Sequence, residues 1–153
     1  MSTVYIVACS QRKSRLLESG SRLPAREAYM GQAFRFSRDA VERKGAPWFI
    51  LSGFYGLLDP DAVIENYDHK MTPFKPGDQW DNCFEHVTDD QLDQLRGAER
   101  VVVLGSRLYA EAAETMLGRP VECPLAGLPI GRMLNALRVG MWDSLPRQWK
   151  GAA

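Results

Sequence analysis

The residues best suited to chemistry lie in loops that follow apolar runs of the sequence. The first group, Cys9-Ser10-Gln11-Arg12-Lys13, comes directly after the run from Thr3 to Ala8. A hydroxyl and two cations at the end of a strand can hold a phosphate or a carboxylate. The same segment also fits a solvated basic turn beside a buried cysteine, and no neighbouring base would activate Cys9 as a nucleophile. As substrate-binding candidates we select Cys9, Ser10, Arg12 and Lys13.

The second group follows the apolar run Pro47 to Ser52 and combines flexible backbone, aromatic rings and acids. Gly53 and Gly56 let the main chain approach a ligand closely, and Tyr55 offers a ring that stacks on a flat base. The acids of this segment suit a catalytic acid or base, although Asp59-Pro60-Asp61 also fits a plain turn. The catalytic candidates are Asp59, Asp61 and Asp68, and the additional binding candidates are Gly53, Tyr55, Gly56 and Tyr67.

Two further segments lead from a strand or a turn into a helix. Ser106 and Arg107 follow the run from Arg100 to Gly105, where the first N–H groups of a helix suit an anion. Helix capping alone would also explain Ser106. Gly127 belongs to the segment Gly127-Leu128-Pro129-Ile130-Gly131-Arg132, which would close a pocket from the other side or form a tight turn. We add Ser106, Arg107 and Gly127 to the binding candidates.

Composition and spacing exclude several classes of function. The formal net charge is zero, with a basic N-terminal third and an acidic middle, so a small ligand is favoured over long DNA. Three cysteines without a CxxC pair and two distant histidines predict neither a disulfide framework, nor a metal site, nor a bound cofactor. Neither a signal peptide nor a membrane span is evident, which predicts a cytoplasmic protein. The usual nucleotide, dinucleotide and hydrolase motifs are absent.

The elements that must position these residues alternate between strand and helix. Continuous apolar runs predict strands over 3–8, 47–52 and 100–105, with a possible fourth over 120–123. Helical periodicity predicts helices from about 29 to 44, over 78–87, 88–95 and 106–116, and from 130 onward. Residues 53–76 form the longest irregular region, and ordered loops of that length commonly carry function.

This alternation predicts a single α/β domain over residues 1–153. Right-handed crossovers give a mostly parallel sheet of about four strands with helices on both faces. Ligands of such sheets bind beyond the carboxyl ends of the strands, so the loops after Ala8, Ser52, Leu104 and Cys123 should converge. The sequence does not predict an oligomeric state.

Several of these segments together resemble a family of small bacterial and phage proteins of uncharacterised function. They are Val7 to Lys13, Pro24 to Tyr29, Trp48 to Ser52, Tyr55 to Asp61, Tyr67-Asp68 and Gly127 to Gly131. That family is similar to the glycosylase-like domain of archaeosine synthase, and through it to the uracil-DNA-glycosylase-like fold. Ser10 and Lys13 match the segment shared with that domain, whereas the tyrosines and aspartates match only the small family.

The resemblance implies a three-layer α/β/α domain that handles a nucleobase. The water-activating motif of uracil-DNA glycosylases and their late histidine loop have no counterpart, because both histidines lie before residue 90. Archaeosine synthase attaches an amino acid to a base in tRNA, so the shared fold does not fix the reaction.

Three hypotheses of function follow from these observations. The first is an enzyme that breaks or exchanges an N-glycosidic bond of a nucleotide or of a flipped or single-stranded nucleic-acid base. In it a tyrosine stacks on the base, Arg12 or Lys13 holds negative charge, and one of the three aspartates activates water. The second is a nucleotide- or nucleic-acid-binding module without turnover. The third is amino-acid or amidine transfer to a deazaguanine base.

Overall fold

The central sheet has three parallel strands and one antiparallel strand in the computed structural model, which describes residues 2–10, 12–67, 87–140 and 142. The strands are β1 (Thr3–Ala8), β3 (Trp48–Ser52), β4 (Gly56–Leu58) and β6 (Arg100–Leu104), in the spatial order β4-β3-β1-β6. β1 pairs parallel with both β3 and β6, and β4 runs antiparallel to β3. The predicted four-stranded, mostly parallel sheet is confirmed.

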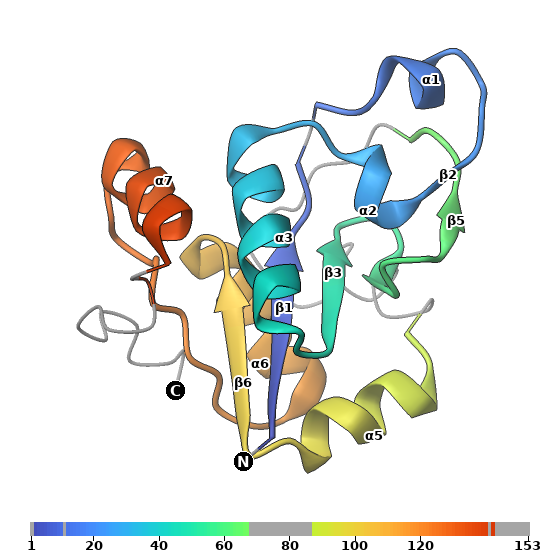
Figure 1. Ribbon diagram of the computed structural model, residues 1–153. Coiled ribbons are helices and arrows are strands. Elements are labelled where there is room, and N and C mark those ends of the chain that lie inside the picture. The colour runs from blue at the N-terminus through green and yellow to red at the C-terminus, as the bar shows by residue number, and fades with distance from the viewer. Residues whose placement is uncertain (1, 11, 68–86, 141, 143–153) are drawn as a thin grey trace.

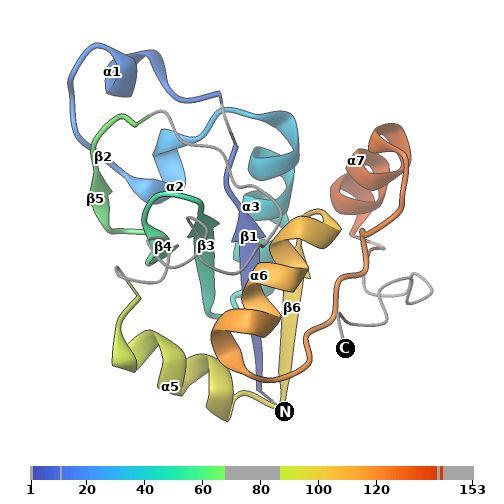
Figure 2. The same cartoon turned by 180° about the vertical axis from the view of Figure 1, so that it is seen from behind.

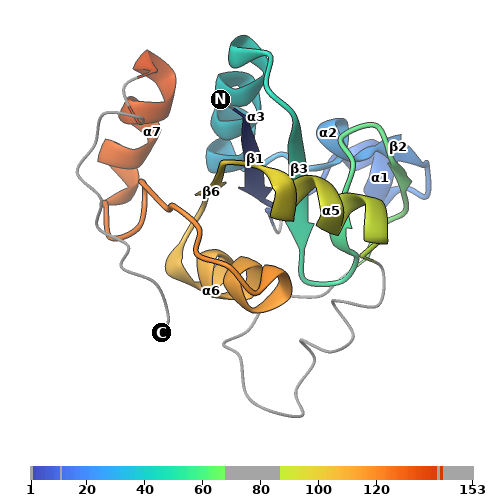
Figure 3. The ribbon, with the colours of Figure 1, turned by 90° about the horizontal axis from the view of Figure 1, so that it is seen from below.

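Helices cover both faces of this sheet, as Figures 1 and 2 show from opposite sides. α3 (Gln32–Lys44) and α7 (Ile130–Val139) lie on one face, and α5 (Asp89–Gly97) and α6 (Arg107–Leu117) lie on the other. The view from below separates the helices on the two sides of the sheet (Figure 3). Alternate residues of β1 explain the two layers, because Tyr5 and Val7 pack toward α3 and α7 while Val4 and Ile6 pack toward α5 and α6.

The strands have continuous apolar runs because both of their faces are covered. All five residues of β3 are buried, and so are Val101 to Leu104 of β6. A sheet with one face in water would instead alternate apolar and polar residues. The apolar runs therefore identify the central layer directly.

Two helix boundaries match their sequence signals. Thr88 and Gln91 form the expected reciprocal capping box at the start of α5. Gly45 ends α3 in the left-handed conformation, with φ of +67°. α3 begins only at Gln32, however, so Tyr29 lies before the helix and pairs with Lys13 in an isolated bridge.

Short elements occupy residues 14–28, for which no helix or strand is predicted, and part of the expected loop 53–76. In residues 14–28 the structure places α1 (Arg15–Glu18), β2 (Leu23–Pro24) and α2 (Ala25–Ala28). β5 (Val63–Ile64) pairs antiparallel with β2. β4 and β5 thus occupy part of the expected loop 53–76. Elements of two to four residues are too short to show periodicity.

The fourth strand differs from the expected one. In the described residues, 120–123 contribute only a single bridge, from Glu122 to Val102, and β4 supplies the fourth strand. Residues 78–86 of the expected helix 78–87 lie outside the described ranges. Within those ranges, no helix combines the length and apolarity that crossing a membrane requires.

Candidate functional site

A cavity of about 640 Å³ opens at the carboxyl ends of β1 and β6. Ala8, Cys9 and Ser10 line it from the end of β1, and residues 104–109 line it from the end of β6 and the start of α6. The remaining walls come from α3 and α7 and from the residues just before each helix, namely Gly31, Ala33, Phe34, Ser37, Leu125, Gly127, Leu128, Ile130 and Met133. The site therefore lies where the topology of a parallel sheet places ligands.

The cavity includes five of the predicted binding residues. They are Cys9, Ser10, Ser106, Arg107 and Gly127. The loops after β1, after β6 and after Cys123 thus meet at one place. Gly53, Tyr55 and Gly56, from the loop after β3, are not among the residues that line the cavity.

Three helices of the described chain begin at this cavity, and their first turns share an electrostatic property. α3 starts after Gly31, α6 after Ser106 and α7 after Pro129, and each start lacks a side-chain cap and an acidic residue in its first turn. The expected capping role of Ser106 is therefore not realised. α5, which does not line the cavity, instead has the Thr88 cap and the acids Asp89 and Asp90. Uncapped helix starts direct partial positive charge toward the cavity.

Arg107 is the only charged residue among the described residues that line the cavity. It opens α6 and is exposed, and within the described ranges its guanidinium forms neither a hydrogen bond nor an ion pair. An arginine at this place has all of its donors available for an oxyanion. Arg107 and the helix starts together make the cavity electropositive.

Cys9 presents a thiol to the same cavity. Its sulfur lies 3.5 Å from the hydroxyl oxygen of Tyr109, and its backbone N–H donates to the Leu51 carbonyl at 3.1 Å. The second bond continues the parallel pairing of β1 with β3 and fixes the position of the thiol. Cys9 is half-buried, which leaves its thiol accessible from the cavity.

Ser10 holds the loop after β1 against the start of α3. Its hydroxyl accepts the Gly31 N–H at 3.1 Å and donates to the Arg12 carbonyl at 2.8 Å, while Met30 N–H donates to that same carbonyl at 2.8 Å. A Cβ atom at position 31 would lie 2.7 Å from the Ser10 Cβ, so the approach requires glycine. These contacts commit the Ser10 hydroxyl to the fold. Arg12 is exposed, and its side chain does not line the cavity.

A cluster of buried hydroxyl groups lies beyond the end of β3. The Tyr67 oxygen is 2.5 Å from the Tyr29 oxygen and 2.9 Å from the Ser52 oxygen. Ser52 already accepts the N–H groups of Phe54 and Tyr55, at 3.2 and 3.1 Å. The hydroxyl groups of Ser52, Tyr67 and Tyr29 thus form a continuous chain of hydrogen bonds.

Both phenols of this cluster stay protonated at neutral pH. Burial raises the pKa of Tyr67 far above its ordinary value, and negative charge on Cys9 would raise it further. The same two causes, in the same order, raise the pKa of Tyr29. The dependence on Cys9 indicates that the thiol and the hydroxyl cluster are electrostatic neighbours.

Lys13 lies against this cluster and is not among the residues that line the cavity. Its ammonium nitrogen is 4.3 Å from the centre of the Tyr67 ring, and the residue is only 9% exposed. Phe54 stacks on the same ring with a centroid distance of 5.2 Å, and Tyr55 meets it edge-on. Three predicted residues, Lys13, Tyr55 and Tyr67, are thus brought together in a group of their own.

The two glycines of the second segment form the turn that leads into β4. Gly56 has a φ of +78° and pairs with Ser52 in the β3–β4 ladder. Gly53 is buried within the turn. The Tyr55 hydroxyl accepts the Glu65 N–H at 3.3 Å, which joins this turn to the residues after β5.

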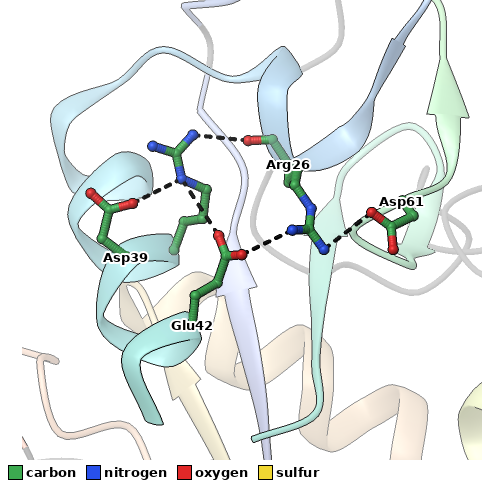
Figure 4. A network of polar contacts seen from close by, with 5 residues as sticks. Arg26, Asp39, Glu42 and Asp61 are labelled. Atoms are coloured by element: carbon green, nitrogen blue, oxygen red, sulfur yellow. Dashed lines mark hydrogen bonds and ion pairs between the residues drawn. The ribbon is translucent and has the colours of Figure 1, made fainter. Parts of the chain in front are cut away.

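Asp59 and Asp61, the two candidate catalytic acids in the described ranges, do not line the cavity. Asp59 accepts a hydrogen bond from Gln91 at 3.3 Å. The Asp61 side chain is 83% exposed and pairs with Arg26 at 3.1 Å, in a surface network that continues to Glu42 (Figure 4). Asp68 lies outside the described ranges. The interpretation of Asp59-Pro60-Asp61 as a plain turn agrees with the bond from the Ala62 N–H to the Asp59 carbonyl at 3.0 Å. The catalytic role of Asp59 and Asp61 stays a prediction, because neither residue lines the cavity.

Several residues of the cavity carry no chemical signal in the sequence. Phe34, Met133 and Tyr109 belong to helix faces whose spacing indicates ordinary core packing. Gly105 is required because a Cβ there would lie 2.7 Å from the Ala8 Cβ. Only the rule that ligands bind at strand carboxyl ends could have placed these residues beside a ligand.

The fold and the cavity define the class of this protein. It is an α/β domain with an electropositive cavity at the carboxyl edge of its parallel strands. Within that class, residues 4–139 match the family of unknown function DUF6884, and the chain belongs to this family. No curated protein matches the chain.

Proposed function

We propose that this protein binds a nucleotide in the cavity at the ends of β1 and β6. The observation that carries the proposal is the convergence of three uncapped helix starts and Arg107 on one largely apolar cavity. Helix N-termini and arginine are the usual partners of phosphate in proteins. Phe34, Leu128 and Met133 supply an apolar wall that suits the faces of a base.

The volume agrees with this ligand class. Small-molecule sites commonly measure roughly 300–1,000 Å³ and are mostly apolar with a few polar groups. The cavity of about 640 Å³ falls within that range. It favours a mononucleotide, or one flipped base with its phosphate, over a long stretch of nucleic acid.

The proposed reaction is cleavage or exchange of an N-glycosidic bond, as the resemblance implies. This reaction requires a carboxylate near the sugar. Among the three candidate acids, Asp59 and Asp61 are committed to Gln91 and Arg26. The proposal therefore assigns the catalytic carboxylate to Asp68, the residue after Tyr67 in the chain.

A binding module without turnover is the second candidate function. One observation favours it, namely that no acid lines the cavity within the described ranges. Such a module would bind the nucleotide with the same helix starts and the same arginine. Product analysis distinguishes the two candidates.

Binding is tested by titrating the protein with AMP, GMP, CMP and UMP in a calorimeter. We expect at least one nucleotide to bind, and Arg107→Gln to weaken its binding about tenfold because a charge-assisted bond to phosphate is lost. Arg15→Gln, at an exposed arginine that does not line the cavity, is the matched control and should leave the affinity unchanged. If no nucleotide binds, the proposed function is wrong.

Turnover is tested by chromatography for free base released from the bound nucleotide. Asp68→Asn should abolish release, whereas Asp59→Asn and Asp61→Asn should retain it. Full activity of all three variants would exclude the proposed glycosidic mechanism. Binding by the wild-type protein with no release of base would favour the binding module.

A further inference from the structure

Ser37 is a largely buried polar residue of the cavity wall whose hydroxyl faces the cavity and pairs with no other described residue. It belongs to α3, is only 3% exposed and lines the cavity. Throughout the described part of the chain, its hydroxyl oxygen forms no hydrogen bond with another residue. Among the described residues Arg26 Nε is the only fully buried side-chain nitrogen or oxygen atom without a partner, so the Ser37 oxygen is open to the cavity, where water or a ligand can pair with it.

The local structure gives Ser37 no structural role. A serine within a helix commonly donates to the carbonyl one turn earlier, which here would be that of Ala33, and this bond is absent from the described contacts. Alanine would favour the helix more strongly and would fit the same wall. Phe34 and Met133, which line the same cavity, have side chains with no polar atom except a thioether sulfur.

A ligand with a polar edge would supply the missing partner. The cavity has its electropositive groups at Arg107 and the helix starts, and Ser37 adds one hydroxyl to the wall formed by α3. A nucleotide has the matching arrangement, since its phosphate is anionic and its base has nitrogen and oxygen atoms on an otherwise flat, apolar ring. One buried hydroxyl is sufficient to distinguish ligands that pair with it from ligands that do not.

We infer that Ser37 is a specificity-determining residue, whose hydroxyl forms a hydrogen bond with a polar atom on the edge of the base. This inference rests on the proposed function and deepens it. The site then recognises an intact nucleoside monophosphate by two separate contacts, the phosphate at Arg107 and the base edge at Ser37. A sugar phosphate without a base makes only the first contact.

The experiment compares Ser37→Ala with the wild-type protein in titrations with AMP, GMP, CMP, UMP and ribose 5-phosphate. We expect the best-bound nucleotide to lose about tenfold in affinity, the usual effect of one hydrogen bond. Ribose 5-phosphate should bind both proteins equally. Ser37→Thr keeps the hydroxyl and should restore most of the affinity, and the melting temperature of each variant verifies folding.

Ser21→Ala is the matched control, because Ser21 is exposed and does not line the cavity. Unchanged nucleotide affinity in Ser37→Ala would overturn the inference and leave the proposed function intact. An equal loss for ribose 5-phosphate would also overturn it, since Ser37 would then act on the anion or on the fold. Failure of the wild-type protein to bind any nucleotide would remove both.

Discussion

The hydroxyl oxygens of Tyr29 and Tyr67 lie 2.5 Å apart, and they join the segment before α3 to the segment after β5. Tyr29 is fully buried, and Phe54 stacks on the Tyr67 ring. Ser52, with no exposed surface, continues the chain of hydroxyl groups into β3. Neutral hydrogen bonds thus hold two loop segments against the end of β3.

Replacing Tyr67 with phenylalanine should destabilise the protein by about 2 kcal/mol. The change removes two hydrogen bonds and leaves the Ser52 and Tyr29 hydroxyls buried without this partner. Tyr29→Phe removes only one bond and should cost about 1 kcal/mol. Urea unfolding measures both values, and equal effects of the two variants would contradict the contribution assigned to the bond between Tyr67 and Ser52.

The same two tyrosines predict a loss of stability in alkali. Their folded-state pKa values lie above the ordinary value near 10, so above about pH 10 the unfolded chain releases phenolic protons that the folded protein retains. Stability from this source is complete below pH 10 and decreases as the pH rises further. Urea unfolding between pH 8 and about 11 should show this decrease in the wild-type protein and a smaller one in Tyr67→Phe. Identical pH profiles would contradict the prediction.

Cys9 and Cys123 should differ strongly in reactivity. Burial raises the pKa of the Cys123 thiol to about 12, and its sulfur lies 3.3 Å from the Gly105 carbonyl. Cys9 is half-buried and lines the cavity. In a Cys83→Ser background, iodoacetamide at pH 8 should therefore modify Cys9 first, as peptide mass spectrometry would detect. Faster modification of Cys123 would contradict the described burial.

Two glycine-to-alanine changes should have opposite effects on stability. Gly105→Ala places a Cβ 2.7 Å from the Ala8 Cβ, and the resulting overpacking should cost about 1–3 kcal/mol. Gly131→Ala, in the first turn of α7, meets no atom within 4 Å and should stabilise by up to about 1 kcal/mol. Thermal and urea unfolding test the pair, and a stable Gly105→Ala variant would contradict the close approach of β1 and β6.

Asp61→Asn should change the free energy of unfolding by less than about 1 kcal/mol. Its carboxylate is 83% exposed, and ion pairs at such surface positions contribute little. Increasing the salt concentration should reduce even this difference. A loss of several kcal/mol in urea unfolding would show that the network around Arg26 carries more of the fold than its exposure indicates.

The sequence predicted the central layer well because burial on both faces leaves a direct signal. Continuous apolar runs identified β1, β3 and β6, and the Thr88 capping sequence and Gly45 marked helix ends that the structure confirms. β4 was missed because its three residues follow a turn that resembles a loop. Its pairing with β3 depends on Gly56, whose positive φ is invisible in a sequence.

The sequence predicted where the candidate site lies but not all of the residues that line it. Strand-end loops supplied Cys9, Ser106 and Arg107, since topology alone brings them together. Ser37 was not predicted, because the sequence does not distinguish a helical serine that faces a cavity from one that faces solvent. Lys13 was selected for its charge, and only the tertiary structure places that charge on the face of Tyr67.

The bare starts of α3, α6 and α7 have a thermodynamic consequence. A helix that lacks a capping side chain forgoes roughly 1 kcal/mol, and within the described chain this occurs at every helix that begins at the cavity. An oxyanion bound as proposed would provide acceptors for N–H groups that no side chain caps. Binding of the ligand would then stabilise the carboxyl end of the sheet, and this end would be less rigid in the protein without ligand.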